Sequence, residues 1–257
     1  AAGRWHEAFA ISNGTGGIGV LTGTAGVGAA RDSSSVGSLP ISPAAVTPDT
    51  RHVMAMSAVT PAATVVPGIA KLIDILYVYP SCVVTTGAGT TLSNAAGKPA
   101  RFNNGKGVKL GAIVAGTAIG AAIPIITCTY VDQDGNTGNT GFLAASANSM
   151  PIGSLLSGSA VAVLGAPEML TAAGDSGVRE LTSYTTATGT TGTVTFFLYR
   201  DLAEVPLIAA NLMSERDYLS QIPSLPVVDD SACLAALVLV GGALVANSPL
   251  MLTVQLQ

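Results

Sequence analysis

Charged residues are scarce in this chain. Of its 257 residues, 11 are Lys or Arg and 15 are Asp or Glu, which is 10% of the sequence, while 49% is hydrophobic. A typical soluble protein is about 25% charged. A folded monomer of 25.5 kDa exposes about 10,400 Å², or roughly 400 Å² for each charge. Large exposed apolar patches usually mark interaction sites, so the composition favours a structural protein whose surface other subunits cover.

Histidine and cysteine are nearly absent, which argues against the common metal sites. His6 and His52 are the only histidines, and neither lies near a cysteine or a pair of carboxylates. Three cysteines at wide spacing fit neither a disulfide framework nor a metal knuckle. We therefore expect Cys82, Cys128 and Cys233 to be buried as small hydrophobic residues, and we expect no metal and no cofactor.

No stretch has the unbroken hydrophobicity of a membrane helix. Residues 110–131 carry no charge and include Gly116-x-x-x-Gly120, a pattern of paired membrane helices. However, Pro124 and three threonines interrupt this stretch, and its second half has the composition of a strand. The sequence also begins without a basic segment followed by an apolar one, so we expect maturation in the cytoplasm and no membrane contact.

Basic residues are too few to predict nucleic-acid binding, which needs a concentrated positive face. Residues 1–130 hold eight basic and four acidic residues, and residues 131–257 hold three and eleven, so the formal charges are +4 and −8. The one basic cluster consists of Lys98, Arg101, Lys106 and Lys109. It is either a solvated loop or a surface that meets the acidic half of a neighbouring subunit.

Glycine and proline punctuate the first 66 residues, so we expect no long helix there. We interpret residues 1–66 as an extended arm that becomes ordered on a partner, or that is disordered in isolation.

Short strand-like runs fill the next segment and predict an all-β fold, with a β-sandwich or jelly-roll core over residues 67–200. The expected strands are 71–79, which Pro80 should end, 83–86, 108–114, 123–131, 193–199, 234–240 and 250–256. The clearest hairpin signal is Asp134-Gly135, after a rising strand at 125–132. Residues 201–257 should form a connector with a helix from Pro206 to Ser220 and a C-terminal β-hairpin within 231–257.

Two glycine motifs resemble catalytic or cofactor signatures. Residues 14–19 (GTGGIG) match the dinucleotide-binding pattern, but the glycine-rich sequence after them does not predict the required helix. The Gly174-Asp175-Ser176-Gly177 turn is similar to the nucleophile turn of chymotrypsin-like serine proteases. Chain order would allow His52, Asp74 and Ser176 to act as base, acid and nucleophile. Alternatively, this sequence simply forms a tight turn.

Two pairs of carboxylates remain as candidate ligands. Asp132 and Asp134 flank the expected hairpin tip, where aspartate favours turns and where calcium is the alternative interpretation. Asp229 and Asp230 follow Pro226, and we interpret them as capping or solvated residues in a loop.

Four segments together resemble virion structural proteins of tailed bacteriophages, most of all head decoration or cement proteins. These segments are 72–80 (LIDILYVYP), 129–136 (TYVDQDGN), 192–200 (GTVTFFLYR) and 229–234 (DDSACL).

The resemblance implies a β-sandwich subunit present in many copies on a capsid. Its partners would be the major capsid protein and copies of itself, with no enzymatic activity. The alternatives are another virion component, such as a neck, tail or host-attachment protein that binds carbohydrate, and a serine hydrolase that uses Ser176.

Overall fold

The computed structural model contains fourteen strands and one short helix in its described part, which confirms the expected all-β fold. The structure describes residues 4–8, 21–39, 50–61, 63, 66–87, 89–94, 97–98, 101, 104–161, 165–189, 191–221, 224–240 and 250–257.

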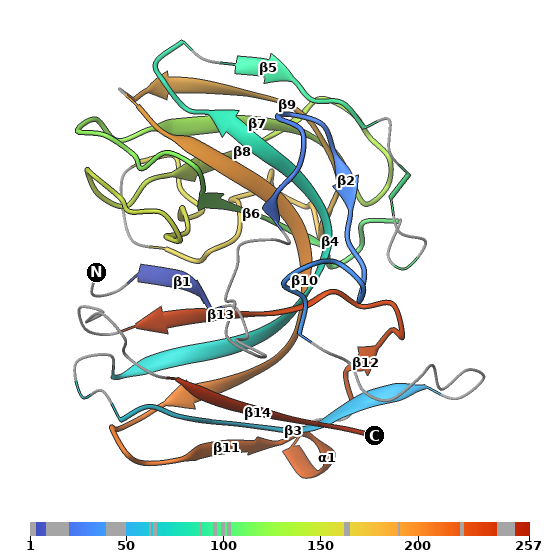
Figure 1. Ribbon diagram of the computed structural model, residues 1–257. Coiled ribbons are helices and arrows are strands. Elements are labelled where there is room, and N and C mark those ends of the chain that lie inside the picture. Colours follow the sequence, from blue (N-terminus) through green and yellow to red (C-terminus); the bar gives the residue numbers. More distant parts are fainter. Residues whose placement is uncertain are drawn as a thin grey trace.

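Two long strands run through both halves of the molecule (Figure 1). β4 (Gly68–Val83) has 16 residues and β10 (Thr193–Leu207) has 15, and they pair antiparallel from end to end. They form the centre of a six-stranded sheet, here called the long sheet, with the order β1-β13-β4-β10-β6 and with β2 paired to β4. Its other strands are β1 (Arg4–Ala8), β2 (Ala29–Ala30), β6 (Lys109–Val114) and β13 (Leu234–Val240).

A second sheet packs against the upper part of the long sheet in the view of Figure 1. Its strands are β5 (Gly89–Thr91), β9 (Val178–Thr188), β7 (Ile125–Asp132) and β8 (Asn139–Ala144), in that antiparallel order. Both sheets contribute large aromatic side chains to the upper core, among them Tyr79, Phe196, Tyr130 and Tyr184. These rings supply much of the apolar area that this half buries.

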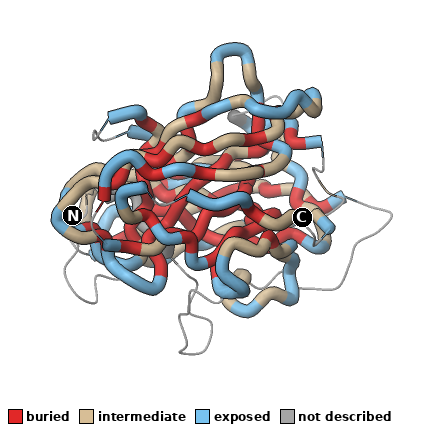
Figure 2. Tube along the Cα trace, turned by 90° about the horizontal axis from the view of Figure 1, so that it is seen from above, coloured by how far each residue is buried: buried red, intermediate tan, exposed pale blue. Residues whose placement is uncertain are grey.

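A third sheet packs against the lower part of the long sheet. Its strands are β3 (Arg51–Val59), β11 (Ser214–Asp217), β12 (Val227–Val228) and β14 (Met251–Leu256), and all of the others pair with β3. The lower core joins Val53 and Met56 of β3 to Leu72 of β4 and Val205 of β10. The molecule is therefore sandwich-like in both halves, and Figure 2 shows buried residues throughout its middle.

β4 is apolar on both faces, which explains its continuous hydrophobic run. Leu72 and Tyr79 face the two cores, while Ile73 and Ile75 belong to a third cluster that Leu21 helps to form. A strand that is buried on both faces does not show the alternation of a half-exposed strand.

The prediction that Pro80 ends this strand is wrong, because β4 continues to Val83. Tyr79 pairs with Phe196 and Cys82 pairs with Val194, so the register shifts at the proline. Proline cannot donate to a ladder and is tolerated within sheets at such irregular positions.

The helix expected from Pro206 to Ser220 is also wrong. β10 continues through Pro206, which pairs with Ile69, and buried and exposed residues alternate from Ala203 to Leu207. β11 follows, and only α1 (Tyr218–Gln221) is helical. Burial against the lower core therefore outweighs the local helical pattern.

One of the two expected hairpins is confirmed. β7 and β8 pair around the Asp134-Gly135 tip, and Gly135 has a φ of 89°, which favours glycine. The C-terminal hairpin does not form, because β13 pairs with β4 in the long sheet while β14 pairs with β3.

Residues 51–59, which we placed in the N-terminal arm, form β3 in the body of the fold. β3 is the strand to which the rest of the lower sheet pairs, and Val53 and Met56 have no exposed surface. β1 pairs with β13 and β2 pairs with β4 in the same way. The strands within residues 1–66 therefore belong to the long sheet and to the lower sheet.

The uncharged stretch at 110–131 contains parts of β6 and β7 rather than a helix. Within the described residues, the structure has no helix whose length and hydrophobicity would let it cross a membrane.

Candidate functional site

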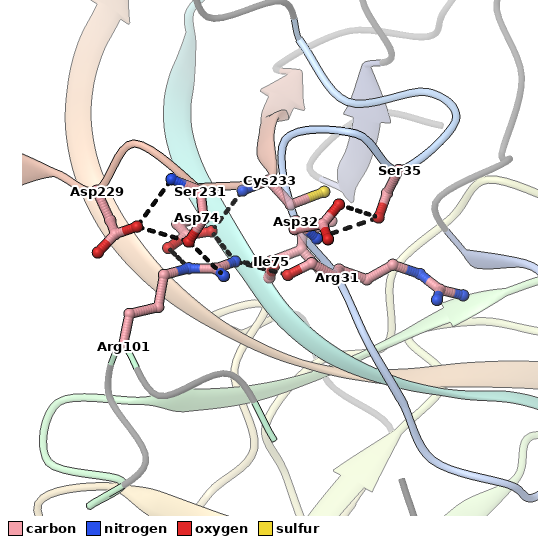
Figure 3. Close-up of polar contacts among 9 residues, drawn as sticks. All are labelled: Arg31, Asp32, Ser35, Asp74, Ile75, Arg101, Asp229, Ser231 and Cys233. Carbon is pink, nitrogen blue, oxygen red and sulfur yellow. Dashed lines mark hydrogen bonds and ion pairs between the residues drawn. The ribbon is translucent and has the colours of Figure 1, made fainter. Parts of the chain in front are cut away.

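The most extensive polar network in the described part centres on Arg101 and Asp74 (Figure 3). Arg101 Nε lies 2.9 Å from Asp74 Oδ2, and Arg101 Nη2 lies 3.0 Å from Asp74 Oδ1. The two side chains are 4% and 1% exposed. This bidentate pair is a strong and directional contact because both groups are charged and planar.

Further hydrogen bonds tie this ion pair to two other segments and to the backbone of β4. Arg101 Nη2 donates to the carbonyls of Arg31 and Ile75 at 2.8 and 3.2 Å, and the backbone N–H of Cys233 donates to Asp74 at 2.9 Å. Burial raises the pKa of the Asp74 carboxyl, and the hydrogen bonds and charge of Arg101 oppose that rise. Both carboxylate oxygens have donors, so this network suits cross-linking of segments rather than proton transfer.

Asp74 lies where the two cores meet along β4. Leu72 belongs to the lower core and Leu76 belongs to the upper core, and Asp74 is midway between them. The loop before β13 closes the network, since Asp229 accepts hydrogen bonds from the backbone and the hydroxyl of Ser231. The ion pair thus replaces apolar packing at the junction of the two halves.

A second polar cluster spans β4, β6 and β10. Lys109 Nζ lies 3.1 Å from Glu168 and 2.8 Å from Asp201, and Lys71 Nζ lies 3.1 Å from the same oxygen of Asp201. Burial lowers the pKa of Lys109, but the bonds and charges of Asp201 and Glu168 outweigh it and leave that pKa raised. Burial also raises the pKa of the neighbouring Tyr199 hydroxyl far above its usual value.

Ion pairs within the chain join its basic first half to its acidic second half. Basic residues of the first half pair with acidic residues of the second half. These pairs are Arg51–Asp230, Lys71–Asp201, Lys98–Glu180, Lys109–Glu168 and Lys109–Asp201. Three members of the predicted basic cluster, Lys98, Arg101 and Lys109, are therefore used within the molecule, while Lys106 lies exposed. Three of the four residues are therefore neither solvated loop residues nor free to meet a neighbouring subunit, the two interpretations considered for this cluster.

The structure does not assemble the triad suggested by Ser176. His52 lies on β3, which pairs with β12 and β14, whereas Ser176 is exposed just before β9. Asp74 binds Arg101 instead. Among the described residues, no hydrogen bond joins Ser176, His52 and Asp74, and the backbone of Ser176 contacts Gln133 and Gly107.

Close backbone packing explains why the last residue of the Gly174-Asp175-Ser176-Gly177 turn is glycine. A Cβ atom on Gly177 would lie 2.1 Å from the carbonyl oxygen of Gly105 and 2.9 Å from the backbone nitrogen of Gly107. This position therefore needs glycine for space. The other glycine motif, at residues 14–19, lies outside the described residues.

The carboxylate pairs organise loops. Asp132 accepts from the backbone of Asp134 and Asn136 and from the side chains of Asn136 and Asn139. The hydrogen bonds from Asn136 in particular lower the pKa of Asp132. Asp230 pairs with Arg51 at 3.1 Å. Within the described residues, no three His, Cys, Asp or Glu side chains are grouped so that they could hold a metal ion.

All three cysteines are buried free thiols, as expected. Burial raises the pKa of Cys82 and of Cys233 to about 12, and it raises the pKa of Cys128 as well.

Sequence analysis missed an exposed apolar surface at one end of the lower sheet. It consists of Ile208, Leu212, Met213 and Met251, each more than half exposed, and we call it the apolar rim. Met251 pairs with Val59, and Met213 precedes Ser214, which pairs with Ala58. In Figure 1 the β10–β11 loop and the start of β14 lie on the same side of this sheet. The uncharged sequence of residues 208–213 was the available signal, but we had assigned it to a helix.

Comparison with protein-family models, with curated proteins and with solved structures found no match for this chain.

Proposed function

We propose that this protein is a structural component of a tailed-bacteriophage virion, which binds the capsid and stabilises it by bridging neighbouring subunits. Its partners would be the major capsid protein and further copies of itself. The same contacts are compatible with a position at the neck or the tail. The proposal starts from the resemblance of four segments to decoration proteins and from the small number of charged residues.

The observation that carries the proposal is the apolar rim. Its side chains are Ile208 at 62%, Leu212 at 52%, Met213 at 58% and Met251 at 67% exposure. Large apolar side chains exposed to this extent have a solvation cost that a partner surface removes. Methionine also adapts to irregular surfaces, which suits a contact repeated on a lattice.

The charge distribution supports the same role. The four rim side chains carry no charge, so an interface that covers only them desolvates no charged group, while the exposed Glu215 of β11 follows Met213 by two residues. Weak contacts of this kind gain strength when many copies bind one shell together.

The test is the occupancy of this protein on purified particles of the phage that encodes it. The double variant Leu212→Asp/Met213→Asp should reduce occupancy by about tenfold or more, because it places charges in an interface that loses water. Val36→Asp is the matched control, since Val36 is 78% exposed in a distant loop, and it should leave occupancy unchanged. Full occupancy of the rim variant, or absence of the wild-type protein from particles, would contradict the proposal.

A further inference from the structure

β14 is an edge strand that carries neither charge nor proline. Among the described residues it pairs with β3 on one side and with no strand on the other. Its sequence, Met-Leu-Thr-Val-Gln-Leu, has no charge and no proline. Edge strands of soluble proteins usually carry lysine, proline or a bulge that prevents another strand from pairing with them.

The backbone of β14 offers hydrogen bonds on its outer side. Gln257 exchanges both backbone hydrogen bonds with His52 of β3, at 2.6 and 3.0 Å. The register with β3 shifts between Gln255 and Leu256, where Met54 of β3 is the extra residue, so the alternation along β14 itself is unbroken. The N–H and C=O groups of Leu252, Val254 and Leu256 therefore point away from β3. A second strand would find three donors and three acceptors there.

The side chains of β14 repeat symmetrically about Val254. Leu252, Val254 and Leu256 are partly buried and pack against the lower core, whereas Thr253 and Gln255 are exposed. An antiparallel copy centred on Val254 would place Val254 opposite Val254 and Leu252 opposite Leu256. Thr253 would then face Gln255 on the solvent side. A slip of one residue would place apolar side chains opposite polar ones, so the pattern selects one register.

We infer that two copies of this chain associate through β14, antiparallel about a two-fold axis at Val254. The pairing continues the lower sheet across both copies, and it covers the apolar side chains of the strand that remain partly exposed. A second copy is the fitting occupant because the contact is self-complementary, as an isologous interface must be. A second copy of β14 is also uncharged, so the pairing leaves no charged side chain without a partner.

The first test is the oligomeric state of the purified full-length protein, by analytical ultracentrifugation at micromolar concentrations. The wild-type protein should be a dimer, and Thr253→Lys should weaken the dimer by about tenfold or more, because lysine on an edge strand opposes pairing. Thr185→Lys is the matched control. Thr185 is also exposed, but it lies on β9, whose two edges pair through Gly89 and Thr127. This control should remain a dimer.

The second test fixes the register. Oxidation of an equimolar mixture of Thr253→Cys and Gln255→Cys proteins should give a disulfide-linked heterodimer, because these positions face each other across the axis. Either variant alone should form far less, and the native cysteines are buried. A monomeric wild type, a dimer that Thr253→Lys does not weaken, or equal cross-linking of the single variants would overturn the inference.

The inference and capsid binding share one residue, Met251, which begins β14 and belongs to the apolar rim, but their tests are separate. A monomer that still occupies particles would overturn the β14 pairing alone, and a dimer that is absent from particles would overturn the virion role alone.

Discussion

Arg101 joins Asp74 by two hydrogen bonds of 2.9 and 3.0 Å at the point where the upper and lower cores meet. Neither side chain reaches solvent to more than 4% of its surface. The same guanidinium also binds two backbone carbonyls, so it organises the chain around the middle of β4. The pair is therefore a buried polar contact at the junction of the two halves of the sandwich.

Removal of one partner of this pair should destabilise the protein strongly. We expect Arg101→Met to cost about 3–5 kcal/mol, because it leaves a buried carboxylate without its counter-charge. The double variant Arg101→Met/Asp74→Asn should recover part of that loss, since the asparagine is neutral and can still accept from Cys233. Urea unfolding of the wild type and the two variants measures their free energies of unfolding. A cost of Arg101→Met near zero would show that the pair does not hold the halves together.

The β7–β8 turn should weaken in acid. The pKa of Asp132 is lowered in the folded protein, so its hydrogen bonds stabilise the fold above the unfolded pKa of about 3.9. That contribution should disappear as the pH falls through the lower folded value. Asp132→Asn should reduce stability at neutral pH and flatten the acid limb of the stability curve. Thermal melts from pH 7 to acid give both quantities. Parallel curves for the two proteins would refute this role.

The three thiols should be inert in the native state. Burial raises the pKa of Cys82 and Cys233 to about 12, so almost no reactive thiolate exists near neutral pH. Mass spectrometry after treatment with a maleimide should find no label on folded protein and three labels after denaturation. Rapid labelling of folded protein at any cysteine would contradict the buried placement.

Gly177 should not tolerate alanine. The added Cβ would lie 2.1 Å from the Gly105 carbonyl, so the backbone must move, at a cost of about 1–3 kcal/mol. Gly97→Ala is the control, because no atom lies within 4 Å of its Cβ position. Denaturant unfolding compares the two variants, and equal stabilities would mean that the Gly177 loop relaxes freely.

The local signals that predicted correctly were turn chemistry and strand composition. Asp134-Gly135 marked the β7–β8 hairpin because few residues accept the positive φ at that tip. The strand predicted at 234–240 has the same bounds as β13, because its aliphatic side chains favour extended backbone.

Long-range contacts decided the features that sequence analysis missed. Pro206 begins a helical pattern, but the pairing of β10 with β4 holds it in a strand. Asp74 had been considered as a catalytic acid, and only the fold revealed that it pairs with Arg101. The apolar rim joins residues 208–213 to Met251 across about 40 positions of sequence, so no local pattern could define it.

Composition and turn residues were enough to predict an all-β chain that is poor in charge and lacks conventional metal spacing, because these signals act locally. The folded chain was needed to show which strands share a sheet, where the charges pair and which apolar side chains stay exposed. These depend on contacts between distant segments, whose energies a linear pattern does not contain.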